Sequence, residues 1–171
     1  MPVEVLLIED SPGDIRLMQE AFREAMTPTN LSVVCDGDEA LAFLRLEGTH
    51  AAAPRPELIL LDLNLPKIDG REVLTQIKSD DDLKMIPIIV LTSSEAEGDV
   101  VAIYHMQANC CLLKPTDLDS FKSLIKTTTD FWLSLAKLPH EYRRPMDRFP
   151  EDTPIPSHGP QARIARNVSG G

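Results

Sequence analysis

The stretch ELILLDLNLPKIDG, residues 57–70, decides the fold. Its first five residues form a nearly continuous apolar run, which is typical of a parallel strand buried on both faces. Asp62 ends this run, and an amphipathic segment begins at Gly70. A buried strand that passes through a short loop into a helix predicts one strand–helix unit of an α/β protein.

The same alternation extends in both directions from this stretch. The expected strands cover residues 3–8, 31–35, 57–61, 87–91 and 110–113. The expected helices cover residues 12–26, 38–46, 70–83, 96–107 and 117–135. Ser11 is a suitable N-cap for the first helix, because Pro12 follows it at the first helical position. Five such units predict a flavodoxin-like, doubly wound, five-stranded parallel sheet of order 2-1-3-4-5 with five helices.

The composition predicts one domain followed by a tail. The chain has 171 residues, of which 43% are hydrophobic, and this is enough for one core of ordinary size. We expect the domain at residues 1–135. Residues 136–171 hold 6 of the 14 prolines and few aliphatic side chains. This segment is therefore expected to be extended or flexible, and too short and polar to form an output domain.

Charge and cysteine content indicate a cytoplasmic protein. The net charge of −10 argues against nucleic acid or an anionic membrane as the main partner. The start, MPVEVLLIED, has no basic segment before its apolar run, so it is expected to be a strand and not a signal peptide. Cys35, Cys110 and Cys111 show no CxxC spacing, which favours a reducing compartment.

Acidic residues follow two strands that are neighbours in the expected sheet. Glu9 and Asp10 end the first strand, and Asp62 ends the third. The carboxyl ends of parallel strands meet at one edge, so three carboxylates come together there. Like charges this close need a cation, and carboxylates with a backbone carbonyl and waters suit Mg²⁺.

Two further strand ends complete the expected pocket. Thr92 follows the fourth strand and offers a hydroxyl donor, while Lys114 follows the fifth and offers a compact cation. Lys114 is suited to neutralise the oxygens of a phosphoryl group in transfer, and Thr92 is suited to donate a hydrogen bond to the same oxygens. Asp62 is then the expected nucleophile, forming an aspartyl phosphate.

Four segments at these strand ends carry a family resemblance: LLIEDS (6–11), ILLDLNLPKIDG (59–70), VLTSS (90–94) and LLKP (112–115). With them the chain resembles the receiver domains of bacterial two-component response regulators, over about residues 3–135. In that family Pro66 and Gly70 match the loop that shapes the pocket.

The resemblance implies that Asp62 accepts a phosphoryl group from a histidine kinase and that Thr92 and Lys114 contact it. The implied metal ligands are Asp10, Asp62, the backbone carbonyl of Asn64 and, through water, Glu9. The implied protein is a phospho-acceptor and not a turnover enzyme, with only autophosphorylation from small donors and autodephosphorylation.

One position departs from the family pattern. Receivers usually carry an aromatic switch residue three positions before the lysine, and this chain has Cys111 there. The usual coupling between the threonine and that aromatic side chain is therefore in question, and Tyr104 is the candidate substitute.

Shorter segments resemble the receivers that work with phytochrome kinases: DIRLMQEAF (14–22), Asn109-Cys110 and DFWLSLAKLP (130–139). This resemblance implies a phytochrome-type kinase and a homodimer. The dimer surface would combine the fourth helix, fifth strand and fifth helix, with Tyr104, Phe131 and Trp132. The alternative for residues 131–135 is an ordinary packed helix end, although their apolar arc is too wide for one face.

Two other classes of protein share part of this chemistry or this fold. A haloacid-dehalogenase-type phosphatase also phosphorylates an aspartate, but it needs an acid two residues later, and Asn64 cannot act as that acid. A flavodoxin-like electron carrier needs a phosphate-binding loop after the first strand, and the loop EDSPGD (9–14) is acidic.

Overall fold

The computed structural model describes residues 1–139. Most of the expected tail, residues 140–171, lies outside the described residues. The described chain forms a five-stranded parallel sheet in the order β2-β1-β3-β4-β5, which confirms the predicted topology. None of the helices in residues 1–139 combines the length and apolar character needed to cross a membrane.

The strands and helices alternate along the chain. The strands are β1 (Val3–Ile8), β2 (Thr29–Val34), β3 (Leu58–Asp62), β4 (Ile88–Thr92) and β5 (Cys110–Leu113). The helices are α1 (Pro12–Glu24), α2 (Gly37–Arg45), α3 (Gly70–Ser79), α4 (Glu97–His105) and α5 (Leu118–Asp130). A short 3-10 helix, Gly48–His50, follows α2, and a π-helix, Phe131–Leu135, continues α5.

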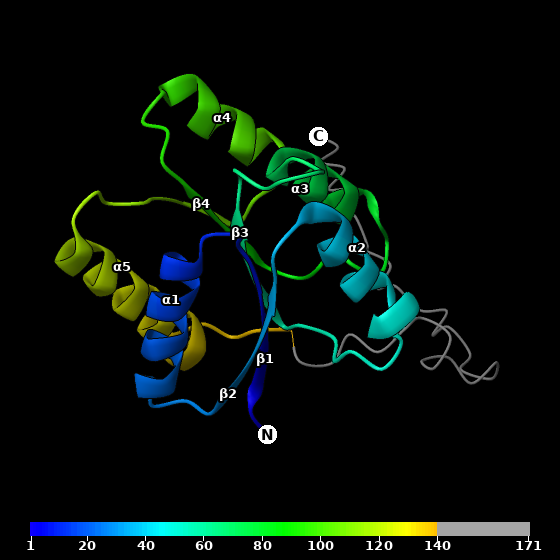
Figure 1. The fold of residues 1–171 in the computed structure, drawn as a ribbon, viewed down its shortest axis with the longest axis horizontal. Coiled ribbons are helices and arrows are strands. Elements are labelled where there is room, and N and C mark those ends of the chain that lie inside the picture. Colours follow the sequence, from blue (N-terminus) through cyan, green and yellow to red (C-terminus); the bar gives the residue numbers. More distant parts are fainter. Residues whose placement is uncertain (140–171) are drawn as a thin grey trace, which may run out of the picture.

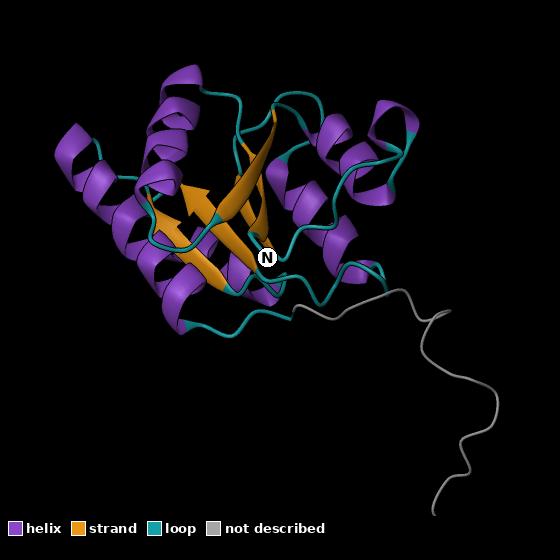
Figure 2. Ribbon diagram, turned by 90° about the horizontal axis from the view of Figure 1, so that it is seen from below, coloured by secondary structure: helices purple, strands orange, loops and turns teal. Residues whose placement is uncertain are grey.

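The helices form two layers, one on each face of the sheet (Figures 1 and 2). Helices α1 and α5 lie on one face, and α2, α3 and α4 lie on the other. Successive side chains of β3 point to opposite faces of the sheet. Leu58 and Leu60 pack under α1 and α5, while Ile59 and Leu61 pack under the other helices. The nearly continuous apolar run of residues 57–61 is explained by this double burial.

Local hydrogen bonds decide where several helices begin and end. The Ser11 hydroxyl accepts the Asp14 N–H at 3.4 Å and caps α1 as predicted. The predicted third helix was too long, because α3 ends at Ser79. There the Asp80 carboxylate accepts the N–H groups of Asp82 and Leu83, which offers the backbone a turn in place of another helical bond.

The end of α5 differs from a regular amphipathic helix. The turn widens into a π-helix at Phe131, and Leu133 is buried there while Trp132 packs partly against the core. Phe131 is 50% exposed and Leu135 is 74% exposed. Leu138, beyond the expected domain boundary, is buried in the core layer of α1 and α5.

Candidate functional site

Three carboxylates meet at the carboxyl edge of the sheet. Oxygen atoms of Glu9, Asp10 and Asp62 all lie within 4.8 Å of one another, and the structure thus brings together the three acids predicted from the sequence. Glu9 and Asp62 are buried and Asp10 is exposed. A buried carboxylate pair with an open third member fits a hard divalent cation, which prefers oxygen ligands and retains waters.

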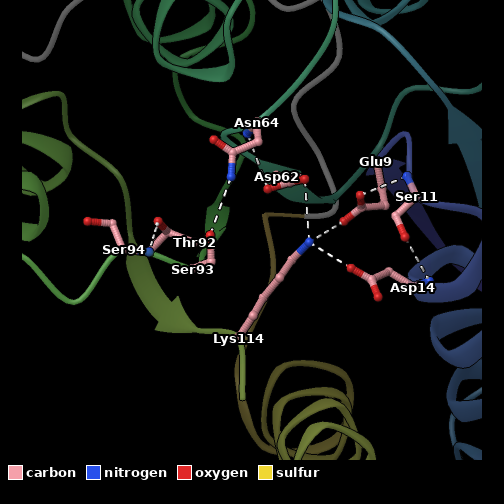
Figure 3. Close-up of polar contacts among 9 residues, drawn as sticks. All are labelled: Glu9, Ser11, Asp14, Asp62, Asn64, Thr92, Ser93, Ser94 and Lys114. Atoms are coloured by element: carbon pink, nitrogen blue, oxygen red, sulfur yellow. Dashed lines mark hydrogen bonds and ion pairs between the residues drawn. The ribbon is translucent and has the colours of Figure 1, made fainter. Parts of the chain in front are cut away.

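The Lys114 side chain reaches into this acidic cluster from the end of β5 (Figure 3). Its Nζ atom lies 2.7 Å from Glu9 Oε2, 2.9 Å from Asp14 Oδ2 and 3.4 Å from Asp62 Oδ2. Only 14% of the Lys114 side chain is exposed, so these ion pairs form with little solvent between them. The ammonium group thus lies beside the carboxylate that the sequence predicts to be the nucleophile.

The electrostatics of the cluster are only partly balanced by Lys114. Burial raises the pKa of Glu9 to about 7, and the charge of Asp62 adds to the rise, although the hydrogen bonds from Lys114 and the Ser11 N–H oppose it. Burial alone would lower the pKa of Lys114, but the hydrogen bonds to Glu9 and Asp14 outweigh it and raise that pKa. A cation beside Glu9 would oppose this rise, because it favours the charged carboxylate.

The loop after β3 is packed closely against the nucleophile position. The Asn64 N–H donates to Asp62 Oδ1 at 3.3 Å. Gly70 begins α3 so close to this loop that a Cβ atom there would lie 2.5 Å from the Asp62 carbonyl oxygen and 2.6 Å from Leu63 Cα. Both neighbours are backbone atoms, so only glycine fits this position. Pro66 is exposed in the same loop.

Thr92 lies at the end of β4, next to β3 in the sheet. Its hydroxyl is buried and accepts the Ser94 N–H at 3.1 Å. The Ser94 hydroxyl in turn lies 2.5 Å from Asp99 Oδ2 on α4. The residue predicted to contact a phosphoryl group is therefore joined to α4 through two hydrogen bonds.

The position of the missing aromatic switch residue has a partner on α4. The Cys111 N–H donates to the Tyr104 hydroxyl at 3.3 Å, and Tyr104 is 50% exposed. Tyr104 thus lies against the position where receivers usually carry the aromatic residue.

Two polar residues of the site were missed in the sequence. Asp14 pairs with Lys114, and Ser93 accepts a hydrogen bond at 3.5 Å from the Asn64 amide. Asp14 lies in the first turn of α1, which begins just after β1. Its position near the carboxyl edge of the sheet could therefore have been predicted from the sequence. Ser93 stands beside Thr92 at the expected end of the fourth strand, but its residue type assigned it no role.

Comparison with known protein families gives a match over most of the chain. The model of the response regulator receiver domain matches residues 5–126. The response regulator Rcp1 of Synechocystis sp. is 46% identical over 138 residues, which cover 81% of this chain and 94% of Rcp1. The probable methanogenesis regulatory protein FilR2 of Methanothrix harundinacea is 37% identical, with 81% of this chain and 88% of FilR2 covered.

Solved structures agree with this match. The Mn²⁺-bound form of Rcp1 superposes with a TM-score of 0.79 at 46% identity and covers 81% of this chain and 99% of that one. The phosphorylated cyanobacterial phytochrome response regulator RcpA superposes with a TM-score of 0.78 at 48% identity, with the same coverage.

Proposed function

Since this chain belongs to the response regulator receiver family, we propose that it signals by accepting a phosphoryl group on Asp62 beside a bound divalent metal ion. One observation carries the proposal: the ammonium group of Lys114 and the carboxylates of Glu9 and Asp10 converge on Asp62 at the carboxyl edge of the sheet. A phosphatase of the haloacid-dehalogenase type and a flavodoxin-like electron carrier have no comparable support.

In the proposed reaction an Asp62 oxygen attacks the phosphorus atom of the donor. The bond from phosphorus to the leaving group breaks, and an aspartyl phosphate remains. From acetyl phosphate the leaving group is acetate, and from a phosphohistidine it is an imidazole that takes up a proton. Lys114 donates to the transferred oxygens, and the Thr92 O–H donates to the same oxygens.

The proposed metal is Mg²⁺. Glu9, Asp10, Asp62 and the backbone carbonyl of Asn64 are the groups that would hold it. When bound, the ion neutralises charge on the transferring phosphoryl oxygens. The Mn²⁺-bound form of Rcp1 supports a divalent ion of this kind in a similar protein.

The proposed phosphoryl donor is a phytochrome-type histidine kinase, because RcpA is a phytochrome response regulator with 48% identity. In this proposal the chain works in the cytoplasm as a phospho-acceptor. It turns over no other substrate and has no nucleic acid or membrane partner. Incubation of the kinase, labelled ATP and this chain should move label from the kinase to the chain. If label stays on phytochrome-type kinases yet reaches the chain from a kinase of another type, the phytochrome assignment is wrong.

The proposed output is association of two copies through the surface formed by α4, β5 and the end of α5. Large apolar side chains are exposed along it: Val101, Tyr104, Leu113, Phe131 and Leu135. A two-fold contact covers the same residues on both copies, and about 1,600 Å² in total is an ordinary interface. Trp132 packs partly against the core and edge-on against Phe131, with ring centroids 5.6 Å apart, so it supports the surface from beneath.

We expect Phe131→Glu to turn a wild-type dimer into a monomer at micromolar concentration, because a charge in an apolar interface must be desolvated. Sedimentation velocity measures this. Met85→Glu is the matched control, since Met85 is 52% exposed in the loop before β4. Phe131 is a better choice than Trp132, whose replacement would also disturb the core. A wild type that sediments as a monomer would contradict the proposed association.

A further inference from the structure

We propose that Asp14 is a positioning residue that holds the Lys114 ammonium group in place for phosphoryl transfer. The proposal rests on the proposed function of Asp62, and it assigns a role to a residue outside the metal-binding carboxylates.

Lys114 Nζ donates hydrogen bonds to Glu9 and Asp14 and forms an ion pair with Asp62. Glu9 and Asp62, at 2.7 and 3.4 Å, belong to the cluster proposed to hold the metal ion. Asp14, at 2.9 Å, does not belong to that cluster. When Glu9 and Asp62 hold the metal ion, Asp14 is still available to pair with Lys114. The Asp14 carboxylate then keeps the ammonium group beside Asp62.

The backbone N–H and the carboxylate of Asp14 both belong to a closed ring of contacts (Figure 3). The Ser11 N–H donates to Glu9 Oε1 at 3.0 Å, and the Asp14 N–H donates to the Ser11 hydroxyl at 3.4 Å. Lys114 closes the ring by donating to both Asp14 Oδ2 and Glu9 Oε2. The Asp14 side chain is only 26% exposed, so the ring links the start of α1 to the end of β5. Such a ring limits the rotamers of Lys114, whose four-carbon stem is otherwise flexible.

A merely electrostatic effect of Asp14 would have the opposite sign from a positioning effect. The Asp14 carboxylate repels an anionic phosphoryl donor, so its loss by itself should speed transfer. If Asp14 positions Lys114, its loss should slow transfer, because the ammonium group is no longer held where charge develops. The direction of the rate change therefore separates the two.

The test is a double-mutant cycle of Asp14→Asn and Lys114→Met. Phosphorylation by acetyl phosphate at saturating Mg²⁺ is followed by intact mass. We expect Asp14→Asn to be about tenfold slower than wild type, the usual worth of one charge-assisted hydrogen bond. In the Lys114→Met background the same change should cause no slowing. Asp14→Ser, a second variant, should slow transfer similarly, whereas Asp119→Asn in the first turn of α5 should not.

A second measurement uses the metal-free protein and needs no phosphorylation. Asp14→Asn should lower the urea midpoint in wild type, where it breaks an ion pair, and raise it in Lys114→Met, where it removes repulsion between carboxylates. Equal midpoint shifts in both backgrounds, unchanged or faster transfer in Asp14→Asn, or equal slowing with and without Lys114 would each overturn the proposal. If wild type takes no phosphoryl group, the proposed function fails, and the urea cycle still decides whether Asp14 holds Lys114.

Discussion

Asp62→Asn is expected to reduce phosphoryl uptake to an undetectable level, at least about a thousandfold below wild type. The amide that replaces the carboxylate has nearly the same shape but no anionic oxygen to attack phosphorus. Lys114 and Thr92 remain in place, and neither side chain can replace the nucleophile under these conditions. The measurement is intact mass after incubation with acetyl phosphate and Mg²⁺, followed by peptide mapping.

The fold should survive this substitution. Asp62 is buried beside Glu9, and its charge adds to the rise in the Glu9 pKa, so its neutralisation relieves a repulsion in the metal-free protein. Asp119→Asn, an exposed acid of α5, is the control and should be phosphorylated like wild type. Uptake by Asp62→Asn at the wild-type rate on another residue would show that the nucleophile lies elsewhere.

The second large effect concerns the metal ion. Asp10→Ala should weaken Mg²⁺ binding at least about tenfold and slow phosphorylation to a similar degree at limiting Mg²⁺. Asp10 is the exposed member of the carboxylate cluster, so its removal opens no cavity. Titration of Mg²⁺ by calorimetry measures the affinity, and the phosphorylation rate is measured over the same concentrations.

The melting temperature and a control variant separate a metal-binding role of Asp10 from a structural one. The metal-free melting temperature of Asp10→Ala should equal or exceed that of wild type, since one of several like charges has gone. Glu97→Gln, at the start of α4, is the control and should bind Mg²⁺ as wild type does. Full phosphorylation of wild type in excess EDTA would contradict a required metal ion.

The sequence predicted the strand order and the meeting of the three acids because both depend on short-range patterns. Residues 57–61 read as a doubly buried strand, and the parallel register of β1, β3, β4 and β5 then places the residues after each strand at one edge. Asp62, Thr92 and Lys114 therefore come from strand ends that any such sheet must bring together. Element type and strand order suffice for this part of the site.

Other features depend on packing that no short pattern records. The Asp14–Lys114 contact joins residues 100 positions apart and depends on how α1 sits on the sheet. Leu118, the first residue of α5, is apolar and yet 54% exposed, which its residue type does not indicate. The π-helix at Phe131 changes which side chains point outward, and a helical period of 3.6 cannot anticipate it.

The hydrogen bond from Cys111 to Tyr104 has a consequence for how the sheet ends. Within residues 1–139, strand β5 pairs only with β4 and is an edge strand, and edge strands invite pairing with other chains and aggregation. Tyr104 satisfies one backbone N–H of this edge from α4, and β5 is only four residues long. Little backbone is left there to extend the sheet into a neighbouring molecule. Sheet extension on this side is thus disfavoured, and a contact between side chains there needs no strand exchange.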